Sequence, residues 1–271
     1  IPMAADIVRS VLLIGVGNVG AGCAVAFAEA GWEVHGVDPS SDLVPSILSS
    51  PPHSFTQCRV QDLSDAALRV HVAHCNEIVH AADCGNRDTY DQEGNLGMAN
   101  VRDFEGFAVR LARLREELNM DSQQPIADNR LHIAYIGGSW TRRAPDADAE
   151  SSEPPLVTDE SLCKSAAQAN AYERAKNRAH DVAQRLTAEL DLSITFYDWA
   201  SVVPNLAPNF TVAKMTASAM ADGHIGYSAG DYGRPLLHAV DAGHALVLVT
   251  ASRPRQAATE ARYDVVLLPG S

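Results

Sequence analysis

A tyrosine and a lysine in the segment 171–190 have the types and the spacing needed for proton transfer. Tyr172 and Lys176 stand four residues apart in a segment with a helical pattern, which places both side chains on one face of the helix. A nearby ammonium favours the phenolate form of tyrosine, so the phenol can exchange a proton with a hydroxyl or carbonyl near neutral pH. The pair is therefore a candidate acid/base centre. The alternative is an ordinary exposed pair, because this spacing often occurs by chance.

A serine is expected close to that pair. Ser139 follows two glycines at the end of a predicted strand, 131–136. The carboxyl ends of parallel strands line the ligand crevice of an open α/β sheet. The Ser139 hydroxyl is thus predicted to hydrogen-bond the same substrate oxygen as Tyr172.

A glycine turn near the N-terminus predicts a dinucleotide site. The segment 11–38, VLLIGVGNVGAGCAVAFAEAGWEVHGVD, has the pattern of a strand, a tight turn, a helix and a second strand. The first glycine permits the turn, the second lets a pyrophosphate approach the backbone, and the third lets the helix pack close to the strand. The phosphates would meet free N–H groups at the helix N-terminus. The residues predicted to surround them are Gly15, Gly17, Asn18, Val19 and Gly20.

An acidic residue completes this pattern. Asp38 lies eighteen residues after Gly20, at the end of the second predicted strand. A carboxylate at that position accepts hydrogen bonds from the adenosine ribose hydroxyls, whereas a 2′-phosphate would face its negative charge. The sequence therefore predicts NAD as the cofactor, with NADP disfavoured. A purely structural glycine turn is the alternative.

The order of apolar and polar segments predicts an α/β fold, a doubly wound parallel sheet of the Rossmann type. We expect residues 1–197 to form the dinucleotide-binding domain and 198–271 a small substrate-binding lobe interleaved with the main sheet. The second crossover, rich in serine and proline, should be short and irregular. Further strands are predicted at 54–60, 78–82, 131–136, 193–197 and 263–268, and helices at 66–74, 100–118, 171–190 and 240–250.

Two segments that follow strands should border the cofactor. Asp62 and Leu63 come after the third strand, near the adenine in this architecture. Ala81 and Ala82 end the fourth strand and should border the nicotinamide side of the crevice. Asp83 follows directly and is a candidate for substrate binding.

Composition excludes several classes of partner. The chain has 271 residues, with 34 acidic against 21 basic side chains and a formal net charge of −13, which argues against nucleic acid or an anionic membrane surface. No apolar run approaches the length of a bilayer span. The five scattered cysteines predict a reducing, cytoplasmic compartment.

One group of histidine and cysteine residues has a spacing that could hold a metal. His71, His74 and Cys75 share a helical spacing, and His80 follows a little later. His80 falls inside an apolar strand while the others lie on the preceding helix. We therefore predict no metal.

In chain order, these motifs resemble the extended short-chain dehydrogenase/reductase superfamily, the group of NAD-dependent epimerases and dehydratases. The resemblance covers most of the chain. It rests on the turn at 15–20, Asp38, Asp62-Leu63, His80-Ala81-Ala82-Asp83, Asn100-Val101, Ser139, Tyr172 with Lys176, and the segment 230–241, GDYGRPLLHAVD.

The resemblance implies a role for each site residue. Tyr172 would be the acid/base, Lys176 its electrostatic partner and the anchor of the nicotinamide ribose, and Ser139 the donor that orients the reacting oxygen. Substrate would contact Asp83, Trp140 and Arg234, since the arginine at this place in the family often binds a nucleotide-sugar diphosphate. A homodimer through helices 100–118 and 171–190 is also implied.

The chain departs from the family pattern in three places. Its glycine turn is spaced like that of ordinary dinucleotide-binding dehydrogenases, because Ile14 stands where the family has a glycine. Ala200 replaces an asparagine that contacts substrate in the family, which argues against a nucleotide-sugar substrate. Trp140 and Thr141 stand where dehydratases have an acidic pair, which disfavours dehydration.

The sequence thus predicts an NAD(P)-dependent oxidoreductase or epimerase that transfers a hydride between nicotinamide and a carbinol or ketone carbon of a small molecule. The alternative is an NAD-binding sensor or scaffold without catalysis. The altered segment 200–203 favours the alternative, and the set Ser139, Tyr172 and Lys176 favours the enzyme.

Overall fold

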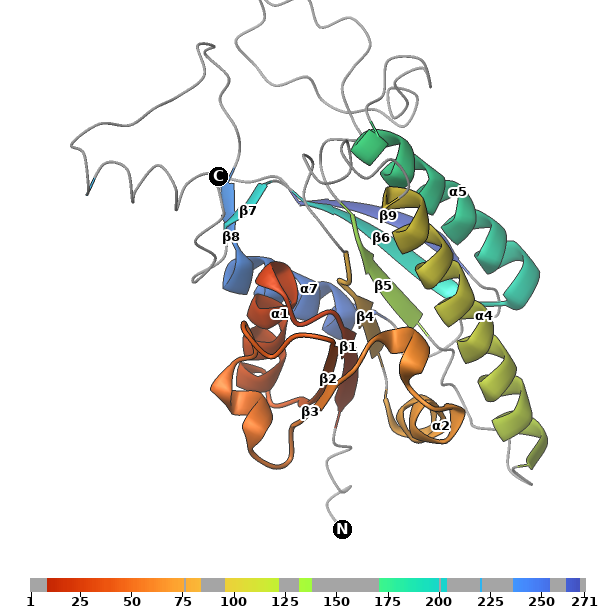
Figure 1. Cartoon of the computed structure of the whole chain (residues 1–271), viewed down its shortest axis with the longest axis horizontal. Coiled ribbons are helices and arrows are strands. Elements are labelled where there is room, and N and C mark those ends of the chain that lie inside the picture. The colour runs from red at the N-terminus through yellow and green to blue at the C-terminus, as the bar shows by residue number, and fades with distance from the viewer. Residues whose placement is uncertain are drawn as a thin grey trace, which may run out of the picture.

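The chain folds around a seven-stranded sheet whose paired strands all run parallel (Figure 1). The strand order is β3-β2-β1-β4-β5-β6-β9, which confirms the predicted doubly wound α/β fold. The computed structural model describes residues 9–75, 77–83, 96–121, 132–137, 171–199, 201–203, 220, 236–253 and 262–268.

The strands of the main sheet are short and are separated by helices. They are β1 Ser10–Ile14, β2 Glu33–Asp38, β3 Ser54–Gln57, β4 Glu77–His80, β5 His132–Ile136, β6 Ser193–Trp199 and β9 Tyr263–Leu268. The helices are α1 Asn18–Glu29, α2 Asp65–His74, α4 Leu96–Asp121, α5 Ala171–Leu190 and α7 Ala239–Ser252, with 3-10 turns η1 Ser46–Ser49 and η2 Val60–Asp62. A second sheet pairs β7 Ser201–Val203 with β8 Leu236–His238.

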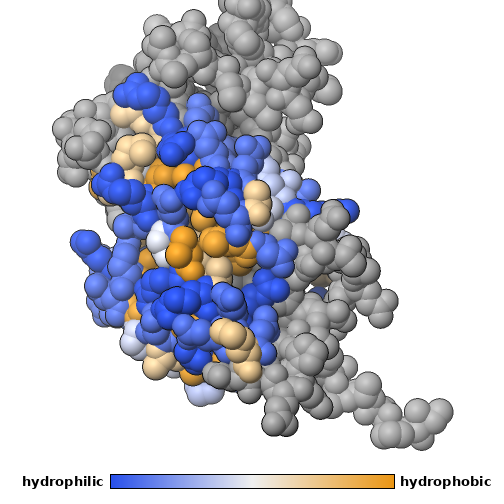
Figure 2. Space-filling view, turned by 90° about the vertical axis from the view of Figure 1, so that its right-hand side faces the viewer, coloured by the Kyte–Doolittle hydropathy of each residue, from blue (hydrophilic) through white to orange (hydrophobic). Residues whose placement is uncertain are grey.

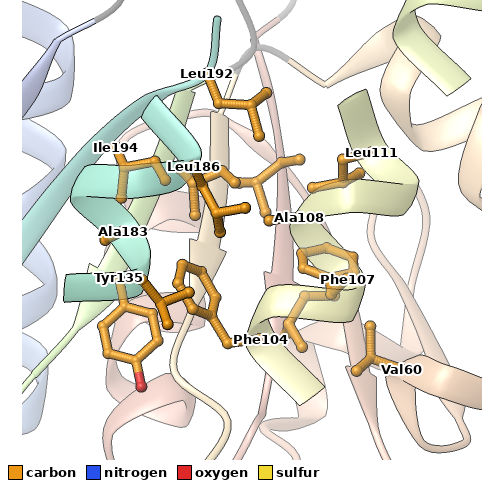
Figure 3. Close-up of a cluster of buried hydrophobic side chains, with 14 of the residues drawn as sticks. Val60, Phe104, Phe107, Ala108, Leu111, Tyr135, Ala183, Leu186, Leu192 and Ile194 are labelled. Carbon is orange, nitrogen blue, oxygen red and sulfur yellow. The ribbon is translucent and has the colours of Figure 1, made fainter. Parts of the chain in front are cut away.

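Alternate side chains of the central strands enter one of two hydrophobic cores. In β1, Val11 and Leu13 face the core shared with α1 and α7, whereas Leu12 and Ile14 face the core shared with α2, α4 and α5. Figure 3 shows part of the second core, where α4 packs Phe104 on β5. Burial of both faces explains why the β1 segment is an unbroken apolar run.

Most predicted elements are present, and several of their boundaries differ from the prediction by a few residues. The third strand ends at Gln57 because the chain turns into η2, so the prediction of 54–60 was too long. The fourth strand is Glu77–His80 and leaves out 81 and 82. Helix α4 begins at Leu96, four residues before the predicted start. The helix 171–190 and the strand 263–268 are as predicted, and the second crossover contains only η1.

The C-terminal part of the chain returns to the main body. Strand β9 pairs with β6, and α7 packs against α1. The division at residue 197 and the interleaved substrate lobe stay predictions. Of the helices that the structure describes, none is long and apolar enough to cross a bilayer.

A polar network closes the amino-terminal ends of β4, β5 and β6. Arg253 donates to both carboxylate oxygens of the buried Glu77, at 3.2 Å each, and to the hydroxyl of Tyr197 at 2.8 Å. His132 contacts both Glu77 and Arg253. A buried carboxylate is tolerated because an arginine pairs with it.

Two glycines let α1 and α7 approach closely. A Cβ atom on Gly22 would lie 2.4 Å from the carbonyl of Ala239, and one on Gly243 would lie 2.7 Å from the Cβ of Ala26. Any side chain at either position would force the helices apart. The close contact between α1 and α7 holds α1, and with it the glycine turn, against the sheet.

We therefore predict opposite effects for two glycine-to-alanine changes. Gly22→Ala should destabilise the fold by about 1–3 kcal/mol, because the added methyl meets backbone atoms. Gly106→Ala, in α4, should stabilise it by about 0.5–1 kcal/mol, because no atom lies within 4 Å of the added Cβ. Urea denaturation measures both. Equal effects of the two changes would contradict the close helix contact.

Candidate functional site

The candidate site begins at the glycine turn between β1 and α1. Gly15 has a φ of +89°, and a Cβ on it would lie 2.5 Å from the backbone nitrogen of Ala82. A Cβ on Gly20 would lie 1.8 Å from the carbonyl oxygen of Gly15. Both positions require glycine for steric reasons, and the turn packs directly on the chain that leaves β4.

The second glycine of the turn faces open space. Apart from the local backbone, no atom of the described residues would lie within 4 Å of a Cβ on Gly17, and its φ of −79° is accessible to any residue. Helix α1 has no acidic residue in its first turn, so its N–H groups and dipole favour an anion there. The buried Oδ1 of Asn18 has no hydrogen-bond partner in the part of the chain that the structure describes.

Asp38 stands beside the turn at the end of β2. Its Oδ2 accepts a hydrogen bond from the Val16 N–H, and its Oδ1 accepts one from the Ser40 N–H, both at 2.8 Å. A carboxylate has about four acceptor positions, so two remain for a diol. The space at Gly17, the N–H groups at the start of α1 and the fixed carboxylate of Asp38 together fit the phosphates and ribose of NAD.

Of the other residues predicted to contact the cofactor, Ala81 and Ala82 lie against this turn. Ala81 donates its N–H to the Ile14 carbonyl at 2.8 Å, which fixes the start of the segment after β4. Asp62 is exposed at the end of η2. The Leu63 side chain is buried in the core, and its carbonyl accepts a hydrogen bond from Arg110. Their contacts with a cofactor stay predictions.

The structure brings Lys176 and Tyr172 together on α5, as their spacing predicts. The Lys176 ammonium lies 5.5 Å from the centroid of the Tyr172 ring and 5.8 Å from that of the Tyr135 ring. Lys176 is buried, whereas Tyr172 is half-buried. The acid/base candidate thus has a cation beside it and remains partly accessible.

Asp83 binds the lysine directly. Its Oδ2 lies 2.7 Å from the Lys176 Nζ, and its Oδ1 accepts a hydrogen bond from the Asn100 Nδ2 at 2.5 Å. The sequence offered Asp83 only as a substrate contact, and that role stays a prediction. Its pairing with Lys176 was missed, because nothing in the spacing of residues 83 and 176 indicates a contact.

Aromatic side chains pack next to Lys176, beginning with Tyr135. The His80 ring stacks on Tyr135 with centroids 5.3 Å apart and meets the edge of Phe104 at 5.2 Å. Burial and the charge of Lys176 lower the pKa of His80 to about 4, so its ring is neutral at physiological pH. Burial also raises the pKa of Tyr135. Neither ring therefore adds a charge near Lys176 at neutral pH.

Three predicted site residues, Ser139, Trp140 and Arg234, lie outside the described residues. His71, His74 and Cys75 lie on or just after α2, and His80 lies in β4. Within the described ranges, no group of three or more histidine, cysteine, aspartate or glutamate side chains is placed to hold a metal.

Comparison with known proteins identifies the architecture. No protein-family model matches the chain, and no curated protein matches it in sequence. Solved structures match 96–97% of it, with TM-scores near 0.7. The fold is that of NAD-dependent sugar-nucleotide epimerases and dehydratases.

Three structures illustrate this epimerase/dehydratase fold. The UDP-glucuronic acid 4-epimerase from Bacillus cereus, in complex with UDP-glucuronic acid and NAD, has 12% identity, a TM-score of 0.70, and 97% of this chain and 78% of its own chain covered. The UDP-glucose 4-epimerase from Thermotoga maritima, with UDP-glucose, has 14% identity and a TM-score of 0.67. The match covers 96% of this chain and 77% of the epimerase chain. An NAD-dependent NDP-hexosamine 5,6-dehydratase of tunicamycin biosynthesis has 16% identity and a TM-score of 0.67. The match covers 96% of this chain and 75% of the dehydratase chain. At these identities the likeness shows the fold.

Proposed function

We propose that the chain is an NAD-dependent oxidoreductase or epimerase that moves a hydride between nicotinamide C4 and a carbinol or ketone carbon of a small molecule. One observation carries the proposal. Gly15 packs on Ala82, and the next residue, Asp83, binds Lys176. The glycine turn and the acid/base pair therefore belong to one continuous site.

Each residue has a defined task in this proposal. Tyr172 gives a proton to the substrate oxygen or takes it back, and the adjacent Lys176 favours the phenolate that forms. Lys176 also anchors the nicotinamide ribose, and Ser139 orients the substrate oxygen. The bound NAD supplies the hydride chemistry.

Asp38 makes NAD the proposed cofactor. Its carboxylate is fixed by the Val16 and Ser40 N–H groups, so it cannot easily turn away from a 2′-phosphate. The structural neighbours include proteins in complex with NAD, which supports the same choice.

The substrate is proposed to be a small alcohol or ketone, bound by Asp83, Trp140 and Arg234. The neighbours named above act on sugar nucleotides. Ala200 stands where the resembling family has a substrate-contacting asparagine, which argues for a smaller substrate. We place reduction or epimerisation ahead of dehydration because Trp140 and Thr141 replace an acidic pair.

A sensing or scaffolding role is the second candidate. It is favoured by the altered segment 200–203, where Ala200 stands in place of the substrate-contacting asparagine of the resembling family. NADH binding without any turnover would support this candidate.

We also propose a homodimer in a reducing, cytoplasmic compartment. Helices α4 and α5 lie side by side on one face of the sheet, and Val109 of α4 is 46% exposed. Figure 2, which looks onto this side of the molecule, shows apolar groups between hydrophilic ones. Pairing of α4 and α5 with the same helices of a second copy, across a twofold axis, would cover these apolar groups.

The cofactor proposal predicts a preference for NADH over NADPH. Asp38→Ala should narrow the difference between the NADH and NADPH affinities, because the carboxylate that repels a 2′-phosphate is removed. Titration of nicotinamide fluorescence measures the four dissociation constants. Asp181→Ala, which removes an exposed acid from α5, is the control and should leave the preference for NADH unchanged. Equal affinities for both cofactors in the unmodified protein would contradict the role given to Asp38.

The catalytic proposal predicts that Tyr172→Phe lowers turnover by about 10²–10⁴-fold, since the variant keeps the ring but loses the proton donor. NADH affinity should stay within about twofold of the wild-type value. The measurement is NADH oxidation with any ketone that the unmodified protein reduces. Turnover at the wild-type rate in Tyr172→Phe would refute the assigned mechanism.

A further inference from the structure

The buried ammonium of Lys176 needs a reason to stay charged. Its side chain is only 6% exposed, and the ammonium lies near two phenol rings. Burial removes hydration and favours the neutral amine unless an opposite charge is close. A neutral amine would no longer favour the phenolate of Tyr172.

Asp83 provides the opposite charge in a fixed position. One carboxylate oxygen lies 2.7 Å from the Lys176 Nζ, and the other accepts the hydrogen bond from Asn100. Asn100 is itself buried, in the first turns of α4. The carboxylate is therefore held at both oxygens, by groups from two different helices.

Three other titratable groups of the described residues lie near Lys176, and none of them carries a negative charge at neutral pH in the free protein. His80, from β4, is buried and has a pKa lowered to about 4, so it is neutral at physiological pH. Tyr135, from β5, is neutral because burial raises its pKa. Tyr172, on α5, is the phenol that the ammonium is proposed to serve.

We propose that Asp83 is a positioning residue of the site: held by Asn100, its carboxylate keeps the buried Lys176 ammonium charged and fixed beside Tyr172. This inference rests on the proposed roles of Tyr172 and Lys176. It adds the residue through which those roles are maintained, and it is separate from the predicted contact of Asp83 with substrate.

The composition of the chain makes the charge of Lys176 directly measurable. The sequence contains three lysines, at positions 164, 176 and 214. Protein labelled with ¹³C at the lysine ε-carbon should give three NMR signals, and the one missing in Lys176→Met identifies Lys176. The ε-carbon shift reports protonation without any substrate or cofactor.

The experiment follows this signal between pH 6 and 11 in the full chain. In the unmodified protein, Lys176 should remain protonated through pH 8. In Asp83→Asn, which keeps the shape of the side chain, Lys176 should lose its proton at least about one pH unit lower, a tenfold rise in its acid dissociation constant. Asp83→Glu keeps the negative charge, so in this variant Lys176 should lose its proton at a pH close to that of the unmodified protein.

Matched variants separate the effect of Asp83 on Lys176 from the effect of removing any negative charge from the protein. Asp181→Asn removes an exposed acid from the same helix and should leave the Lys176 titration unchanged. Asn100→Ala keeps both charges but frees the carboxylate, and should move the titration in the same direction as Asp83→Asn by a smaller amount. If Asp83→Asn does not fold, Asn100→Ala and the unmodified protein still decide the matter.

Two results would overturn the inference. One is an unchanged Lys176 titration in a folded Asp83→Asn or Asn100→Ala variant. The other is a Lys176 that loses its proton below pH 8 in the unmodified protein. The proposed enzymatic function is judged separately, by Tyr172→Phe turnover, because the NMR titration does not depend on catalysis.

Discussion

The contact between the turn after β1 and the chain that leaves β4 is the constraint on which the site depends. Gly15 fits against the backbone of Ala82 with no room for a methyl group, and Gly20 fits equally closely over Gly15. This contact sets where α1 begins and where Asp83 emerges. Asp83 in turn contacts Lys176 of α5. One steric fit therefore joins the proposed cofactor cradle to the proposed acid/base pair.

Much of this arrangement follows from local sequence patterns. The apolar run of β1, the glycine spacing and the helix around Tyr172 each depend on neighbours within a few residues, so periodicity and turn chemistry predict them. The start of α4 at Leu96 was not predictable in the same way, since the preceding residues are polar and the helix is fixed by packing of Phe104 and Leu111 in the core.

Contacts between distant residues were beyond the reach of the sequence alone. Asp83 and Lys176 meet only because β4 and α5 are placed by the whole sheet. The network of Glu77, His132 and Arg253 likewise joins two strand starts and the end of α7. Both are buried polar clusters that tolerate charge because each member has a partner. Such clusters leave no signal in hydrophobic periodicity.

The central claim is that the turn at Gly17 binds the diphosphate of NADH, and Gly17→Asp tests it most directly. Aspartate is a favourable N-cap and Gly17 has free space around it, so the variant should unfold at the same temperature as the unmodified protein or higher. Its carboxylate would occupy the phosphate position and repel the ligand. Calorimetric titration should show one NADH site per chain, weakened at least about 100-fold in the variant, a loss of about 2.7 kcal/mol. Equal NADH affinity in a folded Gly17→Asp variant, or no NADH binding by the unmodified protein, would contradict the account.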